Sequence, residues 1–377
     1  MYDKHTPGEA LSRDLWRMYY DRLNEGLALG YHDKLEQFDP ELAEKLRLNI
    51  ARFSAYKEAG FKRDLTELLG KPREEFLKEA EKVSELYNKA WLDTEYHHTV
   101  ASANMAARWR KFEERKDLYP NLRYIAVQDD RTRASHASWH NTVLPLDHPW
   151  WDTHLPPNDW GCRCGVSQTD EPVSERPEGA VKKAFANNPA KTGKVFANSG
   201  YESALGESAK KEAAAFGEAM LKYVLELAKL KAPLITRYTA PNGAKVKVSP
   251  FADKRPDELM GNYRTAIPIA DDLGRNVSLV AKLDGRLVPG RANLDYLIDG
   301  KAADRKTPRG KKIRNIMRSA VGQRAKIIVL DLSENDQSLD AMIKIVERRL
   351  LSKGFVGIEE VIIVSHDRSA AVSVKRE

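Results

Sequence analysis

The chain has 377 residues, and 62 lysine and arginine residues against 55 acidic residues give it a formal net charge of +7. This length exceeds one usual domain, so we expect two or three domains, each with its own core. With only two cysteines, Cys162 and Cys164, a disulfide framework is excluded and folding in a reducing compartment is favoured. The apolar runs are strand-sized, so the sequence predicts neither a signal peptide nor a membrane span.

The N-terminal part is predicted to be mainly α-helical. Apolar residues recur at helical spacing through residues 8–115, and a long charged helix is expected from about Pro72 to Arg115. Residues 121–170 change to proline, tryptophan, histidine and aspartate, which indicates an irregular, cross-packed module. We therefore expect a helical region over 1–120, this module over 121–170, and a connector with a helix over 171–234.

From residue 235 the rhythm changes to alternating strands and helices, which predicts an α/β domain over 235–377. Helices are expected at 257–273, 310–323 and 337–351. Strands are expected at 245–248, 276–283, 327–332, 361–365 and about 370–375, with a hairpin at 294–306. The resulting α-β-β-β-α-β order resembles the core of restriction-endonuclease-like folds.

The hairpin carries the most informative chemistry of the chain. Asp299 and Gly300 form a turn signal between two short runs, and Asp295 and Asp304 lie on either side of it. Side chains on a strand repeat every two residues, so Asp304 and Lys306 share one face. Two carboxylates and an ammonium at one end of a sheet can hold a divalent cation and prepare a water for attack on a phosphodiester.

Basic residues surround this hairpin. Residues 241–377 carry 26 lysine and arginine residues against 18 acidic ones, and 301–326 contains ten basic residues and one acid, Asp304. Such a field favours a nucleic-acid partner, although a solvated helix face would look similar. The candidate phosphate-binding residues are Lys301, Arg305, Arg309, Lys311, Lys312 and Arg314.

The hairpin resembles the PD-(D/E)xK nuclease motif, and residues 255–377 resemble the C-terminal tRNase-type toxin domains of contact-dependent inhibition proteins. The resemblance implies that Asp295 and Asp304 are metal ligands and that Lys306 orients or polarises the attacking water. It also implies a catalytic role near the site for Gln323, although an exposed residue at a helix end would have the same place in the sequence. Two positions depart from the family: Leu294 replaces a proline, and Gly261-Asn262-Tyr263 stands where a glutamate is usual. Either Glu258, one turn earlier, substitutes for that glutamate, or the third acid is missing.

The same resemblance implies an RNA substrate, above all tRNA, and a cognate immunity protein. Because the ligands are all oxygen atoms, Mg²⁺ is the expected cation, with Zn²⁺ and Mn²⁺ as alternatives.

The module at 121–170 resembles the phage Mu F-type head morphogenesis module. The matching residues are Asp130, Arg133, His136, Trp151, Pro156, Pro157, Cys162, Arg163 and Cys164. The resemblance implies a minor capsid component that contacts portal and capsid proteins and resides in the virion or prohead. His136, Cys162 and Cys164 could also form a structural zinc site completed by His140, His148 or His154, although two buried thiols in a packed core would have the same sequence.

Taken together, the sequence predicts a phage minor head protein that carries a C-terminal metal-dependent endonuclease. The alternative is a purely structural head protein whose C-terminal domain binds nucleic acid or capsid without catalysis.

Overall fold

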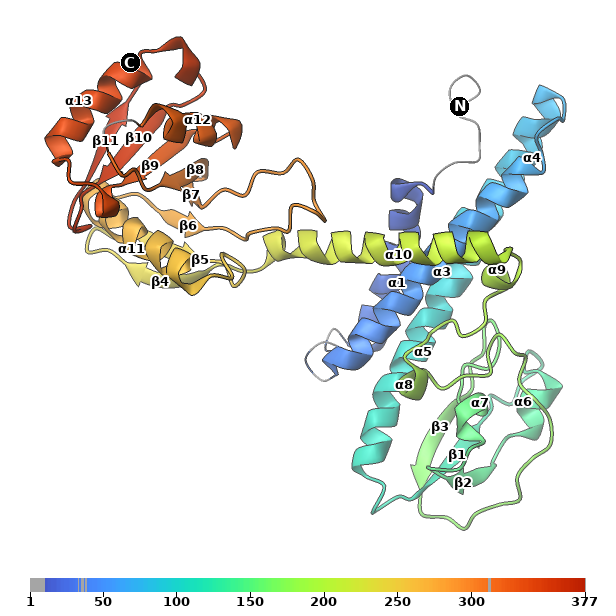
Figure 1. The fold of residues 1–377 in the computed structure, drawn as a ribbon. Helices are drawn as coiled ribbons and strands as arrows, with labels where there is room; N and C mark the ends of the chain where they lie inside the picture. The colour runs from blue at the N-terminus through green and yellow to red at the C-terminus, as the bar shows by residue number, and fades with distance from the viewer. Residues whose placement is uncertain (1–10, 33, 35–36, 38, 311–312, 377) are drawn as a thin grey trace. The chain divides into compact units, whose positions relative to one another are not determined.

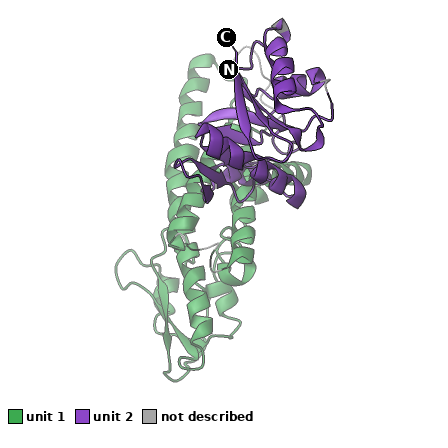
Figure 2. Ribbon diagram, turned by 90° about the vertical axis from the view of Figure 1, so that its left-hand side faces the viewer, with its two compact units in different colours: residues 1–221 green, residues 222–377 purple. Residues whose placement is uncertain are grey.

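The computed structural model describes residues 11–32, 34, 37, 39–310 and 313–376. The chain forms two compact units, residues 1–221 and 222–377 (Figure 2). The first is mainly helical, and the second is a mixed α/β sheet domain (Figure 1). No helix within these described ranges combines the length and the apolar character needed to cross a membrane.

The first unit is built on long helices. They are α1 (Arg13–Gly30), α3 (Pro40–Thr66), α4 (Arg73–Glu85) and α5 (Trp91–Glu114), and the π-helical turn η1 (Leu86–Ala90) joins the last two. The predicted 72–115 helix is therefore confirmed, with Pro72 as its N-cap residue. Helices α1 and α5 pack so closely that a Cβ on Gly30 would lie 2.5 Å from the Cβ of Ala103. That contact requires glycine.

A small sheet and several short helices follow. Strands β1 (Asn121–Ile125), β2 (Val143–Pro145) and β3 (Gly165–Thr169) form an antiparallel sheet in the order β2-β1-β3. The short helices are α6 (Ala134–Ser138), α7 (Trp151–His154), α8 (Pro189–Thr192) and α9 (Gly200–Ser203). Trp139, Trp150 and Trp151 are buried among them, which confirms the tightly cross-packed module expected from the sequence. Helix α10 (Glu207–Ala228) and the turn η2 (Lys229–Lys231) come next.

The second unit contains one eight-stranded sheet in the order β11-β10-β9-β8-β7-β6-β5-β4. The strands are β4 (Ile235–Thr239), β5 (Lys245–Val248), β6 (Val277–Leu279), β7 (Tyr296–Ile298), β8 (Lys301–Lys306), β9 (Ile327–Asp331), β10 (Glu360–Val364) and β11 (Ala371–Lys375). Three neighbouring pairs are parallel: β5 with β6, β8 with β9, and β9 with β10. The other pairs are antiparallel.

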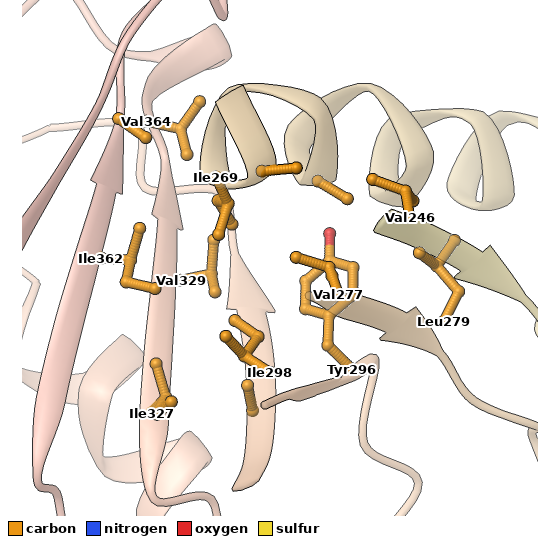
Figure 3. Packing of buried hydrophobic residues seen from close by; sticks show 14 of the residues in the cluster. Val246, Ile269, Val277, Leu279, Tyr296, Ile298, Ile327, Val329, Ile362 and Val364 are labelled. Atoms are coloured by element: carbon orange, nitrogen blue, oxygen red, sulfur yellow. The ribbon is translucent and has the colours of Figure 1, made fainter. Parts of the chain in front are cut away.

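Helices cover both faces of this sheet. Helix α11 (Pro256–Leu273) packs on one face, and α12 (Arg314–Gly322) and α13 (Leu339–Leu350) pack on the other. The short turns η3 (Leu332–Glu334) and η4 (Lys353–Phe355) precede and follow α13 in the chain. Central strand β9 is buried throughout because its residues alternate between two cores: Ile327 and Val329 face α11 (Figure 3), whereas Ile328 and Leu330 face α12 and α13. A strand buried on both faces reads as a continuous apolar run.

The observed order α11-β6-β7-β8-α12-β9 is the predicted α-β-β-β-α-β order. One predicted strand is too long, since β6 ends at Leu279 rather than at residue 283. Strand β4 was not predicted at all; most of its side chains are exposed, so no burial pattern marks it in the sequence.

Candidate active site

The two candidate acids meet because of the local geometry of one hairpin. Asp299 and Gly300 have φ of 46° and 81°, the left-handed pair that a tight two-residue turn between twisted strands requires. The turn sets the register, in which Tyr296 pairs with Ala303. The next position along the hairpin therefore places Asp295 beside Asp304, and their carboxyl groups lie within hydrogen-bonding reach. The predicted hairpin and the predicted convergence of the acids are both present.

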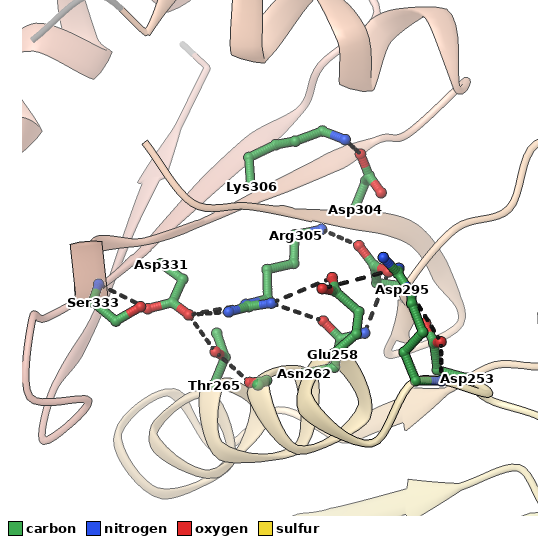
Figure 4. Close-up of polar contacts among 12 residues, drawn as sticks. Asp253, Glu258, Asn262, Thr265, Asp295, Asp304, Arg305, Lys306, Asp331 and Ser333 are labelled. Carbon is green, nitrogen blue, oxygen red and sulfur yellow. Dashed lines mark hydrogen bonds and ion pairs between the residues drawn. The ribbon is translucent and has the colours of Figure 1, made fainter. Parts of the chain in front are cut away.

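Asp304 is buried and contacts both of its predicted catalytic neighbours. Lys306 Nζ lies 2.5 Å from its Oδ2, so the two side chains share one face of β8 (Figure 4). The amide nitrogen of Gln323, just after α12, donates to Oδ1 at 2.8 Å and to Oδ2 at 2.5 Å in the amide orientation that satisfies both groups. Burial raises the pKa of Asp304 to about 6; the hydrogen bond from Lys306 opposes this rise, and the charge of Asp295 adds to it.

Asp295 has a different environment. Its Oδ1 accepts a hydrogen bond from Lys282 Nζ at 2.6 Å, and its Oδ2 accepts one from the backbone N–H of Arg305 at 2.8 Å. The amide of Asn262 on α11 also approaches Oδ1, at 3.4 Å. Burial opposes ionisation, but the charge and the hydrogen bond of Lys282 outweigh it and lower the pKa of Asp295. One acid of the pair is therefore held ionised while the other is held closer to neutral.

Arg305 does not belong to the basic surface on which we predicted it. It points away from Asp304 and Lys306, toward α11, and its guanidinium pairs with Asp331 Oδ2 at 2.6 Å (Figure 4). Its side chain is only 9% exposed, because neighbouring residues on a strand face opposite sides of the sheet. A phosphate could reach this guanidinium only by disrupting the buried pair, so the prediction that Arg305 binds nucleic acid is corrected.

The Arg305 pair is part of a buried polar network. Asp331 also accepts hydrogen bonds from Arg368 at 2.9 Å and from the Thr265 hydroxyl at 2.9 Å. Burial opposes its ionisation, but the hydrogen bonds from Arg368 and Arg305 lower its pKa to about 2. A Cβ on Gly261 would lie 3.0 Å from the Arg305 guanidinium, which explains why glycine suits this turn of α11.

Glu258, the predicted substitute for the missing glutamate of the first helix, does not reach the acid pair directly. Its Oε1 lies 3.6 Å from Arg305 Nη1, on the α11 side of the sheet. The α11 side chain that does reach Asp295 is Asn262, one turn later. Asn262 therefore occupies the place that the sequence prediction gave to Glu258.

The other predicted phosphate-binding residues are dispersed. Lys301 pairs with Glu359 at 2.8 Å, next to the hairpin turn, and Arg309 pairs with Glu334 at 2.8 Å. Arg314 is exposed at the start of α12. Lys311 and Lys312 lie outside the described residues.

Lys282 and Asn262 are the site residues that the sequence reasoning missed. Lys282 lies on the long β6–β7 connection, and its approach to Asp295 depends on the path of that connection, for which the sequence holds no motif. Asn262 could have been found from the sequence, because it lies in the Gly261-Asn262-Tyr263 segment that stands where the family usually has a glutamate.

A second predicted cluster lies in the first unit. His136 Nδ1 is 3.7 Å from Cys162 Sγ and 3.6 Å from Cys164 Sγ. The proposed fourth ligands are engaged elsewhere: Nδ1 of His140 accepts from the Ala126 N–H, and Nδ1 of His148 accepts from the Trp150 N–H. His154 stacks on Trp150.

Comparison with known proteins separates the chain into the same two parts. Residues 67–167 match the family of phage Mu protein F like proteins, and residues 292–370 match the contact-dependent growth inhibition CdiA C-terminal domain. The chain therefore joins a domain of the phage Mu F type to a C-terminal domain of the CdiA toxin type, which confirms both resemblances found in the sequence.

Among curated proteins, capsid assembly protein F of Escherichia phage Mu is 44% identical over 82 residues, which are 22% of this chain and 19% of that protein. The Mu-like prophage FluMu F protein of Haemophilus influenzae is 49% identical over 70 residues, 19% of this chain and 17% of that protein. The matches thus span less than a fifth of these relatives. A chain of the CdiA-CT/CdiI toxin and immunity complex from Burkholderia pseudomallei is 21% identical, with 33% of this chain and 91% of that chain covered and a TM-score of 0.25.

Proposed function

We propose that this protein is a minor component of a phage head and carries a C-terminal metal-dependent nuclease that acts as a toxin. The match of residues 67–167 to Mu F-like proteins, including a capsid assembly protein, supports the first half. The match of residues 292–370 to the CdiA C-terminal domain supports the second.

One observation carries the nuclease proposal. Asp295 lies just before β7, Asp304 and Lys306 lie on β8, and Gln323 follows α12, and these side chains meet at one end of β8. Two buried carboxylates in contact repel each other when both are ionised, and a fold retains such an arrangement most readily when a cation relieves the repulsion. Burial raises the pKa of Asp304, and the charge of Asp295 adds to that rise, as expected for a carboxyl group at a functional site.

The donor set fits a hard divalent cation. Asp295 and Asp304 would hold it through carboxylate oxygen atoms, the ligands that Mg²⁺ and Mn²⁺ prefer, and Zn²⁺ accepts them as well. When bound, such a cation would supply stabilisation of the charge that develops on the phosphoryl oxygens. Lys282 now donates to the same carboxylate of Asp295, so cation binding and this ion pair compete.

The remaining residues have distinct tasks in this proposal. Lys306 would orient a water toward the phosphodiester, and Gln323 would fix the carboxylate of Asp304 through its amide. Arg314 and other exposed basic residues would attract the polyphosphate backbone. We propose RNA, and tRNA in particular, as the substrate, with a separate immunity protein that blocks the domain in the producing cell.

A direct assay tests the nuclease. Purified full-length protein is incubated with total tRNA and with plasmid DNA, with and without Mg²⁺, next to the Asp304→Asn variant. We expect Mg²⁺-dependent cleavage of tRNA by the wild type and none by the variant. Absence of cleavage of both nucleic acids with Mg²⁺, Mn²⁺ and Zn²⁺ would reject the proposal.

The head assignment has its own test. Mass spectrometry of purified proheads and mature heads should detect peptides of this chain at low copy number. Absence from both particles would remove the head from the proposal but leave the nuclease untouched.

A purely structural C-terminal domain remains the second candidate, and one observation favours it. Each acid already has its own lysine, Lys282 for Asp295 and Lys306 for Asp304, so the four charges balance without a cation. In that case Asp304→Asn would leave any nucleic-acid breakdown unchanged.

A further inference from the structure

We propose that His136, Cys162 and Cys164 bind one zinc ion within the Mu F-type module, independently of the nuclease site. Within the ranges that the structure describes, these three form the one cluster of three or more histidine, cysteine or acidic side chains whose ligand atoms converge, all within 4.8 Å of one another. Both cysteines are free thiols.

The distances fit a tetrahedral zinc ion. With Zn–N of about 2.0 Å and Zn–S of about 2.3 Å, the edge of a tetrahedron between a nitrogen and a sulfur ligand is about 3.5 Å. The two observed Nδ1–Sγ distances are 3.7 and 3.6 Å. One central ion therefore satisfies both distances at once.

Hydrogen bonds alone account less well for this arrangement. A neutral imidazole nitrogen has one lone pair and accepts one good hydrogen bond, yet both sulfur atoms lie at nearly the same distance from Nδ1 of His136. The imidazole is also held in place, since it is buried and stacks on Trp139 at an interplanar angle of 22°. A pre-oriented nitrogen facing two thiols is a preformed ligand set.

The ligands come from two separate segments. His136 lies in the five-residue helix α6, and the two cysteines lie just before β3. A short helix gains little stability from its own hydrogen bonds, so a metal bridge between these segments would hold the module together. Binding would displace the two thiol protons to solvent. A water would take the fourth position, because His140 and His148 direct Nδ1 to backbone N–H groups.

The test uses the full-length protein. Zinc content is measured by mass spectrometry after expression with added zinc, and the metal is then replaced by Co²⁺. We expect a thiolate-to-cobalt charge-transfer band with the intensity of two thiolates. The chain has two cysteines, so this band cannot come from a carboxylate site around Asp304.

Variants separate the ligands from their neighbours. Cys164→Ser and His136→Ala should each lose the wild-type cobalt spectrum, whereas His140→Gln and Asp304→Asn should keep it. If the ligand variants fail to fold, the wild type alone decides: removing zinc with a chelator should lower its Tm, and adding zinc back should restore it. A wild-type protein without bound zinc and without a sulfur-to-cobalt band would overturn the proposal, whatever the outcome of the nuclease assay.

Discussion

The carboxyl groups of Asp295 and Asp304 contact each other across one hairpin, yet their pKa values shift in opposite directions. The charge and hydrogen bond of Lys282 outweigh burial and lower the pKa of Asp295, whereas burial raises that of Asp304 to about 6. Pairs of acids whose environments separate their pKa values are frequent at sites of acid–base and metal chemistry.

Replacing Asp304 by Asn should abolish Mg²⁺-dependent cleavage, because the shape is kept while a ligand charge is lost. Lys306→Ala should leave the cation bound but reduce turnover by roughly a hundredfold or more, the scale of a positioned acid–base group. The measurement compares cleavage rates and growth inhibition at equal expression. Equal toxicity of the wild type and both variants would show that the hairpin is not the active site.

Lys282→Met should strengthen binding of the cation, in contrast to the loss of a ligand charge in Asp304→Asn. Its Nζ lies 2.6 Å from Asp295 Oδ1, so removing it frees an oxygen ligand and should strengthen Mg²⁺ binding by about tenfold, equivalent to ~1.4 kcal/mol. Titration calorimetry checks this, with Lys301→Met as the control because Lys301 pairs with Glu359 near the turn. Weaker Mg²⁺ binding by the Lys282 variant would contradict the competition.

Cleavage should fall as the pH is lowered through about 6. Asp304, whose pKa burial raises to about 6, takes up a proton there and loses the charge that holds a cation. The raised pKa affects the stability of the fold in the opposite direction. The folded chain binds this proton more tightly than the unfolded chain does, so the stabilisation that protonated Asp304 provides is present below pH 3.8 and is lost as the pH rises through about 6. Rate profiles at subsaturating Mg²⁺ and urea unfolding at several pH values measure the two effects, and a flat rate through pH 6 at subsaturating Mg²⁺ would argue against ionised Asp304 as a ligand.

Lys57→Met should destabilise the first unit. Lys57 Nζ lies 2.9 Å from Glu95 Oε2, and the two side chains are 0% and 3% exposed. Removing the ammonium would leave a buried, uncompensated carboxylate, at a cost of roughly 3–5 kcal/mol. Urea unfolding measures the loss, and the double variant Lys57→Met/Glu95→Gln should recover part of it.

Limited proteolysis should release a stable C-terminal fragment that begins around residues 232–250. We place the boundary there because the sequence changes near Pro233 from helical spacing to alternating strands and helices, and its net charge becomes positive. Strands β4 and β5 are paired in the sheet, which favours cutting toward the start of that window. Resistance of this stretch, with cutting inside 257–375 instead, would place the boundary elsewhere.

Local patterns in the sequence were sufficient for most elements of the second unit, though not for β4, and for the core of the candidate site. Strand β5 has its predicted bounds, and the Asp-Gly turn fixed the register that joins Asp295 to Asp304. What the sequence did not reveal depends on distant partners. The burial of Arg305 requires Asp331 from β9, and Lys282 reaches Asp295 only through the path of the β6–β7 connection. The alternation of side chains along a strand predicts that Arg305 lies on the other face of the sheet from Lys306, but it does not predict the ion pair with Asp331.

Consecutive residues of strand β8 face opposite sides of the sheet and lie in two different environments. Asp304 and Lys306 face the candidate site, while Arg305 between them is paired with buried Asp331. Insertion of one residue at the Asp299–Gly300 turn would reverse the two faces, bringing the guanidinium into the site and a carboxylate and an ammonium against α11. A one-residue shift in the register of this hairpin would therefore remove the candidate site and also break the buried Arg305–Asp331 ion pair. An inactive but well-folded toxin domain should arise by substitution at the acids rather than by a change in hairpin length.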